Sequence, residues 1–171
     1  MAHPMIRQFG DPILRSVCSE VTQFNDALQE KIIVMKRIME EAGGVGLAAP
    51  QVGSLQRMLI YRLPGDDGPS SSGELQVLIN PEWVSAGMGE QPALEGCLSL
   101  PGIQLPVVRE VAIHVTAQDP TGGKVEFLAE DLEARIIQHE TDHLNGKLIL
   151  EHVSPEIRRE AILTINQYLG S

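Results

Sequence analysis

The 171-residue sequence predicts an α+β fold, with a single domain over 1–171. Mixed or antiparallel β-sheets are expected to pack around a central helix that bears an HExxH motif, with further helices near the two ends. Three observations predict this fold. Apolar residues recur at helical spacing in three segments, and the middle of the chain alternates apolar and polar residues as strands do. No repeat and no linker-like stretch divides the chain.

The first predicted helix begins after Asn25, a residue type that suits an N-cap. The apolar residues that follow are spaced so that they share one helical face. These residues are Leu28, Ile32, Met35 and Met39. Gly43 and Gly44 then interrupt the pattern and end the predicted helix.

The middle of the chain is predicted to form strands. The segments "RMLIYRL" (57–63) and "LQVLIN" (75–80) are short and carry β-branched or aromatic residues, and the polar segment 64–73 between them is predicted to be a surface loop. Further along, apolar residues alternate on both sides of "DPTGG" (119–123). That pattern is typical of a β-hairpin.

Two more helices are predicted after the hairpin. One runs from about Leu132 to Asn145, and the other follows Ser154 and Pro155, a pair suited to the N-cap and first helical positions. The apolar stripe of the last helix consists of Ile157, Ala161, Ile165 and Leu169.

Bulk properties exclude several classes of function. The net charge of -10 and the pI near 4.9 disfavour DNA binding, because phosphate binding needs clustered Lys and Arg. No apolar run approaches the roughly 20 residues that span a bilayer, and the first residues lack the apolar core of a secretion signal. We therefore expect a cytoplasmic protein without membrane or DNA partners. Cys18 and Cys97 have no disulfide-framework spacing and are treated as single thiols.

The segment "QHETDH" (138–143) carries the strongest chemical signal. His139 and His143 are four residues apart on a predicted helix, so both imidazoles can reach one metal ion. Glu140 lies nearly a quarter turn away, where its carboxylate could reach a metal-bound water without becoming a ligand. The alternative is a pair of core histidines bonded to carbonyls, with Glu140 in a surface ion pair.

A catalytic metal site needs a third protein ligand. The long metalloprotease pattern would place a histidine at position 149, which is Ile149 here, so that pattern is excluded. A zinc endopeptidase with a downstream glutamate ligand, Glu156 or Glu160, remains open. So does Cys97, which with two histidines would leave a fourth position for water. A purely structural metal is a third alternative. Cys18 is assigned to packing.

Three segments together resemble the signature motifs of the peptide deformylase family. They are "GVGLAAPQ" (44–51), "EGCLSLPG" (95–102) and "QHETDH" (138–143), in that order. The resemblance covers nearly the whole chain. It implies a metal-dependent amidohydrolase that removes the N-formyl group from the formylmethionine of newly synthesised polypeptides. In that reaction a metal-bound hydroxide attacks the formyl carbon, with Glu140 as general acid/base.

The resemblance also implies roles for individual residues. The implied metal ligands are Cys97, His139 and His143. Gln51 and the backbone N–H of Leu98 are implied to polarise the formyl oxygen. Val45, Gly46 and Gly96 are the implied contacts to the substrate peptide.

The ligand types do not specify the metal, since a thiolate and two imidazoles suit zinc, iron, cobalt or nickel. The resemblance implies one Fe²⁺ per chain, which Zn²⁺, Ni²⁺ or Co²⁺ can replace. N-formylmethionyl nascent peptides are the implied partners. Transient association with the ribosome is a further expectation, for which the last helix offers only Arg158 and Arg159 as support.

Charged residues around the motifs are expected to hold them together. Asp142 is predicted to pair with Arg109. Glu95 is either the partner of the free ring N–H of a ligand histidine or a solvated loop carboxylate.

Overall fold

The computed structural model describes residues 2–65 and 73–170. Most of the predicted surface loop 64–73 lies outside these residues. The elements, in chain order, are η1 (Pro12–Arg15), α1 (Asp26–Glu41), β1 (Gly46–Ala48), η2 (Ala49–Val52), β2 (Met58–Tyr61), β3 (Gln76–Ser85), β4 (Glu90–Cys97), β5 (Leu100–Glu110), β6 (Ala112–Gln118), β7 (Lys124–Glu130), α2 (Asp131–Leu144), η3 (Ile149–His152) and α3 (Pro155–Leu169).

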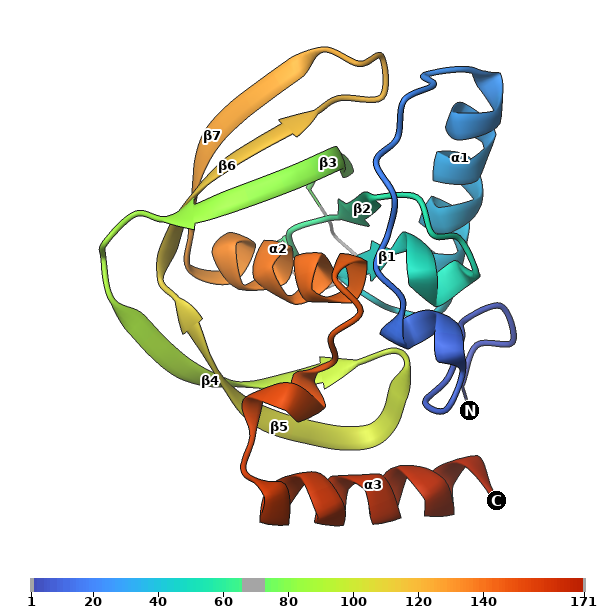
Figure 1. Cartoon of the computed structure of the whole chain (residues 1–171), viewed down its shortest axis with the longest axis vertical. Coiled ribbons are helices and arrows are strands. Elements are labelled where there is room, and N and C mark those ends of the chain that lie inside the picture. Colours follow the sequence, from blue (N-terminus) through green and yellow to red (C-terminus); the bar gives the residue numbers. More distant parts are fainter. Residues whose placement is uncertain (1, 66–72, 171) are drawn as a thin grey trace.

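The strands form two antiparallel sheets with helix α2 between them. One sheet has the order β1-β2-β3-β6-β7, and the other consists of β4 and β5. Figure 1 shows α2 running between the two sheets, with α1 beside β1 and β2 and α3 outside β5. The predicted α+β class, the antiparallel sheets and the central HExxH helix are therefore confirmed.

All three predicted helices are present, and their N-terminal caps explain where two of them begin. The side chain of Asn25 accepts a hydrogen bond from the N–H of Leu28 at 3.1 Å, and α1 starts at the next residue. Ser154 caps α3 in the same way, with Pro155 at the first helical position. The apolar stripe of α3 is buried only at its centre, at Ala161 and Ile165.

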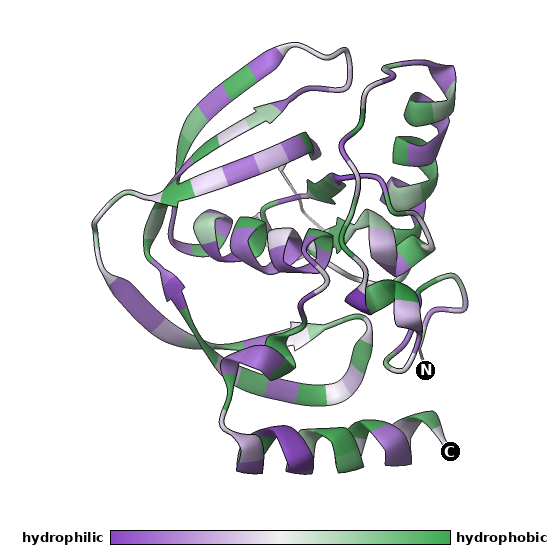
Figure 2. Ribbon diagram, viewed as in Figure 1, coloured by the Kyte–Doolittle hydropathy of each residue, from purple (hydrophilic) through white to green (hydrophobic). Residues whose placement is uncertain are grey.

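The predicted hairpin is confirmed as β6 and β7, which pair from Ala112↔Glu130 to Gln118↔Lys124. Figure 2 shows hydrophilic and hydrophobic residues alternating along β7, as expected for a strand with one buried face. The second predicted strand, β3, extends five residues beyond Asn80. Asn80 has a positive φ of 52° and lies at a register shift, so the strand continues past an irregularity.

The sequence did not predict the hairpin of β4 and β5. Within "EGCLSLPG", Cys97 is the last residue of β4 and pairs with Leu100 at the start of β5. The strand β5 ends at Glu110 and β6 begins at Ala112, so the segment "VREVAIHV" (108–115) contributes to both strands.

The core surrounds α2 on both sides. Buried residues of α2, including Ile136, Ile137 and Leu144, pack against the five-stranded sheet, and a separate apolar cluster joins β5, η3 and α3. In the described part of the chain, no helix is long and apolar enough to cross a bilayer.

Candidate metal centre

Three side chains meet at the junction of helix α2 and the β4–β5 hairpin. One ligand atom from each of Cys97, His139 and His143 lies within 4.8 Å of the other two, and among the described residues this is the one such group of His, Cys, Asp and Glu. Cys97 Sγ is 3.3 Å from His143 Nε2. The thiol and two imidazoles are a donor set that binds zinc, iron, cobalt or nickel, so the residues present fit a transition metal.

The electrostatics of this group favour the thiolate form of Cys97. Burial opposes ionisation of the Cys97 thiol, but the His143 and His139 imidazoles outweigh it and lower the pKa of Cys97 to about 5. The same thiolate, with Glu95, raises the pKa of His139 against the effect of burial. The lowered pKa favours the thiolate form of Cys97, which is the form that ligates a metal.

Glu95 orients one of the two histidines. Its Oε2 lies 2.9 Å from His139 Nδ1. The other ring nitrogen of His139, Nε2, is therefore the one available to bind a metal. Arg109 donates two hydrogen bonds to Glu95, each of 3.0 Å. Burial opposes the charge on Glu95, but the hydrogen bonds from His139 and Arg109 lower its pKa to about 2. Of the two alternatives for Glu95, the histidine partner is confirmed.

Arg109 also makes the predicted bond to the HExxH helix. Its Nη1 is 2.6 Å from Asp142 Oδ2. Asp142 in turn lies 2.7 Å from Nε2 of His152, at the end of η3. A chain of polar and charged groups thus joins the exposed His152 to His139, through Asp142, Arg109 and Glu95.

Glu140 is buried beside the cluster of Cys97, His139 and His143. Only 5% of the residue is exposed, and its Oε2 has no hydrogen-bond partner among the described residues. Burial raises the pKa of Glu140, although the nearby histidines oppose this effect. A buried carboxylate with one unpartnered oxygen and a raised pKa is suited to accept and return a proton.

Gln51 approaches the site from η2. Its Oε1 accepts a hydrogen bond from the N–H of Ala48 at 2.9 Å, and its Nε2 donates to Ser99 Oγ at 3.2 Å and lies 3.8 Å from Cys97 Sγ. The carbonyl of Leu98 accepts from Gln8, which holds the turn between β4 and β5 in place. An amide donor is therefore fixed next to the thiolate.

These residues surround a cavity of about 530 Å³. Its walls come from the segment before β1, from the end of β4 and start of β5, and from α2. The predicted site residues that line it are Val45, Gly46, Gln51, Gly96, Cys97, Leu98, His139 and Glu140. His143 is not among the lining residues and is 1% exposed. The fold thus brings all nine predicted site residues to one place.

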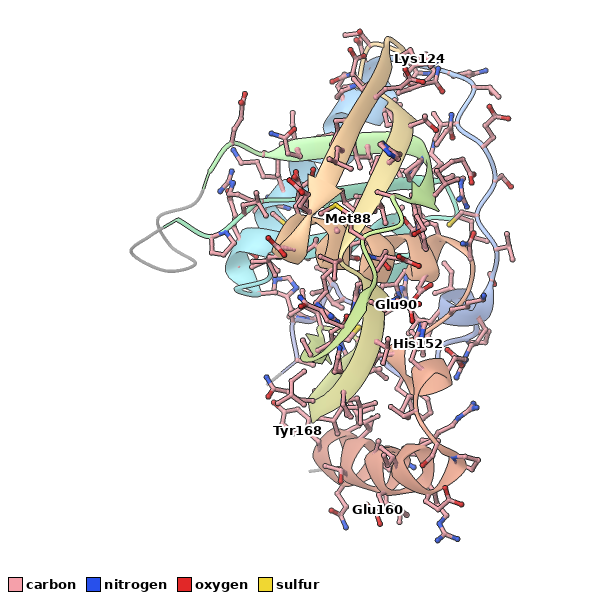
Figure 3. All side chains as sticks on the ribbon, turned by 90° about the vertical axis from the view of Figure 1, so that its left-hand side faces the viewer. Met88, Glu90, Lys124, His152, Glu160 and Tyr168 are labelled. Atoms are coloured by element: carbon pink, nitrogen blue, oxygen red, sulfur yellow. The ribbon has the colours of Figure 1, made fainter. Side chains whose placement is uncertain are left out.

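The alternative ligands lie elsewhere. Glu156 and Glu160 are exposed residues of α3, and Figure 3 shows Glu160 projecting from the outer side of that helix. Cys18 is buried in the apolar core, where burial raises the pKa of its thiol to about 11.

Comparison with known proteins identifies the family. A family model described as Polypeptide deformylase matches residues 4–159. Peptide deformylase 1 of Corynebacterium glutamicum is 41% identical to this chain, over 95% of this chain and 94% of its own. The chain belongs to the peptide deformylase family.

Other deformylases agree in sequence and in fold. The peptide deformylase of Clostridium botulinum is 44% identical over 90% of this chain and 99% of its own. The crystal structure of a peptide deformylase from Legionella pneumophila has a TM-score of 0.88 at 39% identity, covering 95% of this chain and 93% of that chain. The predicted family is confirmed, and the zinc endopeptidase alternative finds no support in these comparisons.

The sequence analysis missed two residues at the site. Arg135 lines the cavity and binds Glu95, and Ser99 holds the amide of Gln51. Arg135 lies four residues before His139, so helical spacing places both on one face of α2, and that signal could have identified Arg135. Ser99 has no comparable signal, because its contact depends on the unpredicted hairpin.

Proposed function

We propose that this chain hydrolyses the N-formyl group of N-terminal formylmethionine in newly synthesised polypeptides, and that its 171 residues act as one catalytic domain. This proposal rests on one observation. Cys97, His139 and His143 meet beside the buried carboxylate of Glu140, at the edge of one cavity. Three protein ligands leave a coordination position for water, as catalytic rather than structural sites do.

We assign Cys97, His139 and His143 as ligands of one Fe²⁺, for which Zn²⁺, Ni²⁺ or Co²⁺ can substitute. A bound divalent cation supplies Lewis acidity, which polarises the formyl group and lowers the pKa of water from about 15.7 toward 7. Affinity alone favours Zn²⁺ over Fe²⁺, so iron occupancy depends on supply and on protection from oxidation. Metal analysis after anaerobic purification tests this assignment.

Glu140 is assigned as the general acid/base. Its unpartnered Oε2 can take the proton of the attacking water, and its raised pKa favours holding that proton until the amine leaves. The proton then passes to the methionine nitrogen as the bond between this nitrogen and the formyl carbon breaks, so the peptide leaves as a neutral amine. Formate and a peptide with a free N-terminus are the products.

Gln51 and Leu98 are assigned to the formyl oxygen. Negative charge develops on this oxygen as water adds to the carbon, and hydrogen-bond donors fixed in advance stabilise it. A donor of this kind is worth roughly 3 to 4 kcal/mol in comparable sites. The bonds of Gln51 to Ala48 and Ser99 hold its amide in place before substrate arrives.

Val45, Gly46 and Gly96 are assigned to the substrate backbone. β1 is the edge strand of its sheet, and β4 pairs on one side only, so a strand edge borders the cavity on each side. An extended peptide can pair with such an edge, with its main chain held by hydrogen bonds. Val45 then forms part of the apolar wall around the methionine side chain.

Because the proposed substrates are nascent chains, the protein is expected to act where polypeptides are synthesised. We place the protein in the cytoplasm and propose that it meets its substrates through transient association with the ribosome. The exposed α3 carries Arg158 and Arg159, although the first also lies 3.9 Å from Glu151. Cosedimentation with ribosomes, compared between the parent and a variant with both arginines changed to glutamate, tests the association.

Product analysis tests the reaction itself. The metal-loaded protein is incubated with a formyl-Met peptide that contains further peptide bonds, and the products are identified by mass spectrometry. A deformylase yields formate and the full-length peptide with a free amine. Shorter fragments would instead indicate an endopeptidase and overturn the proposal.

A further inference from the structure

Arg135 lies on helix α2, one turn before the ligand His139, and faces the cavity. Only 9% of the residue is exposed. A buried guanidinium needs several acceptors, because desolvating its charge is costly. The acceptors of Arg135 therefore show what it holds together.

Its three acceptors all belong to the β4–β5 hairpin. Nη1 donates to Glu95 Oε1 at 2.8 Å and to the carbonyl of Val107 at 2.9 Å, and Nη2 donates to the carbonyl of Gln91 at 2.7 Å. One bond reaches a side chain of β4, one the backbone of β4 and one the backbone of β5. The arginine thus binds both strands of the hairpin that ends in Cys97.

Arg135 also supplies positive charge to Glu95. Glu95 is the carboxylate that orients His139, and Arg109, its other cationic partner, is shared with Asp142. Arg135 gives Glu95 a guanidinium that it does not share with Asp142, whose own partners are Arg109 and His152. Without it, Glu95 and Asp142 would compete for one arginine.

We propose that Arg135 is a positioning residue for the metal centre. It clamps the hairpin that carries Cys97 to the helix that carries His139 and His143, and it fixes the carboxylate that orients His139. Its hydrogen bonds go to Glu95, Val107 and Gln91 and not to the proposed ligands. This inference rests on the proposed ligand set and predicts that Arg135 sets metal affinity.

Titration of the metal-free protein with Co²⁺ under anaerobic conditions tests this proposal. The absorption bands of cobalt report the coordination, and the thiolate-to-cobalt charge-transfer band reports the bond to Cys97. We expect Arg135→Met to weaken Co²⁺ binding about 10- to 100-fold, the range for residues that support metal ligands. The charge-transfer band should also lose intensity. Binding as tight as in the parent, with the same spectrum, would overturn the proposal.

Arg57→Met is the matched control. Arg57 also bridges separate elements through three acceptors, at 2.8 Å to Asn145 Oδ1, 3.0 Å to the Pro81 carbonyl and 3.0 Å to Glu82 Oε1, but it does not line the cavity. Its loss should lower the melting temperature and leave the affinity for Co²⁺ unchanged. Equal loss of affinity in both variants would reduce Arg135 to a general structural residue.

Arg135→Lys keeps the test decisive if the methionine variant does not fold. One ammonium keeps the charge but cannot span all three acceptors as the planar guanidinium does. We expect an affinity between those of the parent and Arg135→Met, and parent-like affinity would contradict the clamp. The proposed function fails separately: a parent that binds Co²⁺ through its thiolate but does not cleave formyl peptides would refute the reaction and not the role of Arg135.

Discussion

Gly46 lies directly against the carboxylate of Glu140. A Cβ at position 46 would be 2.6 Å from Glu140 Oε1 and 3.1 Å from its Cδ, closer than side chains normally approach. Strand β1 therefore approaches the proposed catalytic base as closely as it does because residue 46 has no side chain. We had expected this glycine to admit the substrate, and the structure adds that it makes room for the base.

Gly46→Ala should therefore impair catalysis rather than metal binding. The new methyl group would displace the Glu140 carboxylate from its position beside the metal group. Since a positioned acid/base contributes typically 10²- to 10⁴-fold, we expect kcat to fall at least about 100-fold. Steady-state kinetics and metal content, measured on the same preparation, check this expectation. A normal kcat would show that Glu140 need not lie where it does.

Gly96→Ala is the contrasting change on the opposite wall. A Cβ there would meet only the Ile103 carbonyl at 3.8 Å and Gln104 Cγ at 3.9 Å, which are ordinary contacts. The protein should fold normally, but the methyl group would face the proposed path of the substrate backbone. We expect a higher KM with a smaller change in kcat. A kcat loss as large as that of Gly46→Ala would contradict the separate roles of the two glycines.

Glu140→Gln separates a catalytic site from a structural one. The amide has nearly the same shape as the carboxylate but cannot accept the proton of water. We expect activity to fall about 10²- to 10⁴-fold while metal content and melting temperature stay near those of the parent. Full activity in this variant would remove Glu140 from the mechanism.

Cys97→Ala should abolish tight metal binding. The two histidines that remain form an incomplete set, so adding metal should no longer raise the melting temperature as it does for the parent. Cys18→Ala serves as the control, because its thiol is buried in the core away from the site. That variant should lose some stability and keep its metal. Differential scanning fluorimetry with and without Zn²⁺ distinguishes the two, and a metal-dependent rise in Cys97→Ala would count against its role as a ligand.

The Glu95 network predicts a pH-dependent stability of the metal-free protein. The pKa of Glu95 is about 2 in the folded state, below its ordinary value of 4.5, so folding favours the carboxylate. Its contribution is fully present above about pH 4.5 and is lost as the pH falls toward 2. The difference between the two pKa values corresponds to roughly 3 kcal/mol. Urea unfolding of the parent and Glu95→Gln should show their largest difference in free energy of unfolding at neutral pH. A difference that does not shrink below pH 4.5 would contradict this account.

The sequence predicted those parts of the fold that depend on local patterns. Asn25 and Ser154 cap helices where expected, and the spacing of His139 and His143 placed both imidazoles on one face of α2. The hairpin β4–β5 was missed because β4 lacks the alternation of a strand and its one buried residue is Glu95. Burial of that charge is explained only by arginines distant in sequence, which no local pattern reveals.

The third ligand shows the same limit at the site. From the residues alone, Cys97, Glu156 and Glu160 were all open, because which of them meets two histidines depends on how strands and helices pack. The resemblance to deformylases selected Cys97, and the structure places Cys97 Sγ 3.3 Å from His143 Nε2 while both glutamates lie exposed on α3. Contacts that join distant segments, such as those of Arg135 and Ser99, could be identified only from the structure.

The most direct test of the central claim is a comparison of two substrates. Anaerobically prepared, Fe²⁺-loaded protein is given a formyl-Met peptide and its acetyl-Met counterpart, and release of the free amine is followed in parallel. We predict rapid deformylation and far slower loss of the acetyl group, because its added methyl must fit among Gln51, Leu98 and Glu140, the cavity residues proposed to act on the carbonyl. Failure of the metal-loaded protein to cleave the formyl peptide, or equal cleavage of both, would contradict the account.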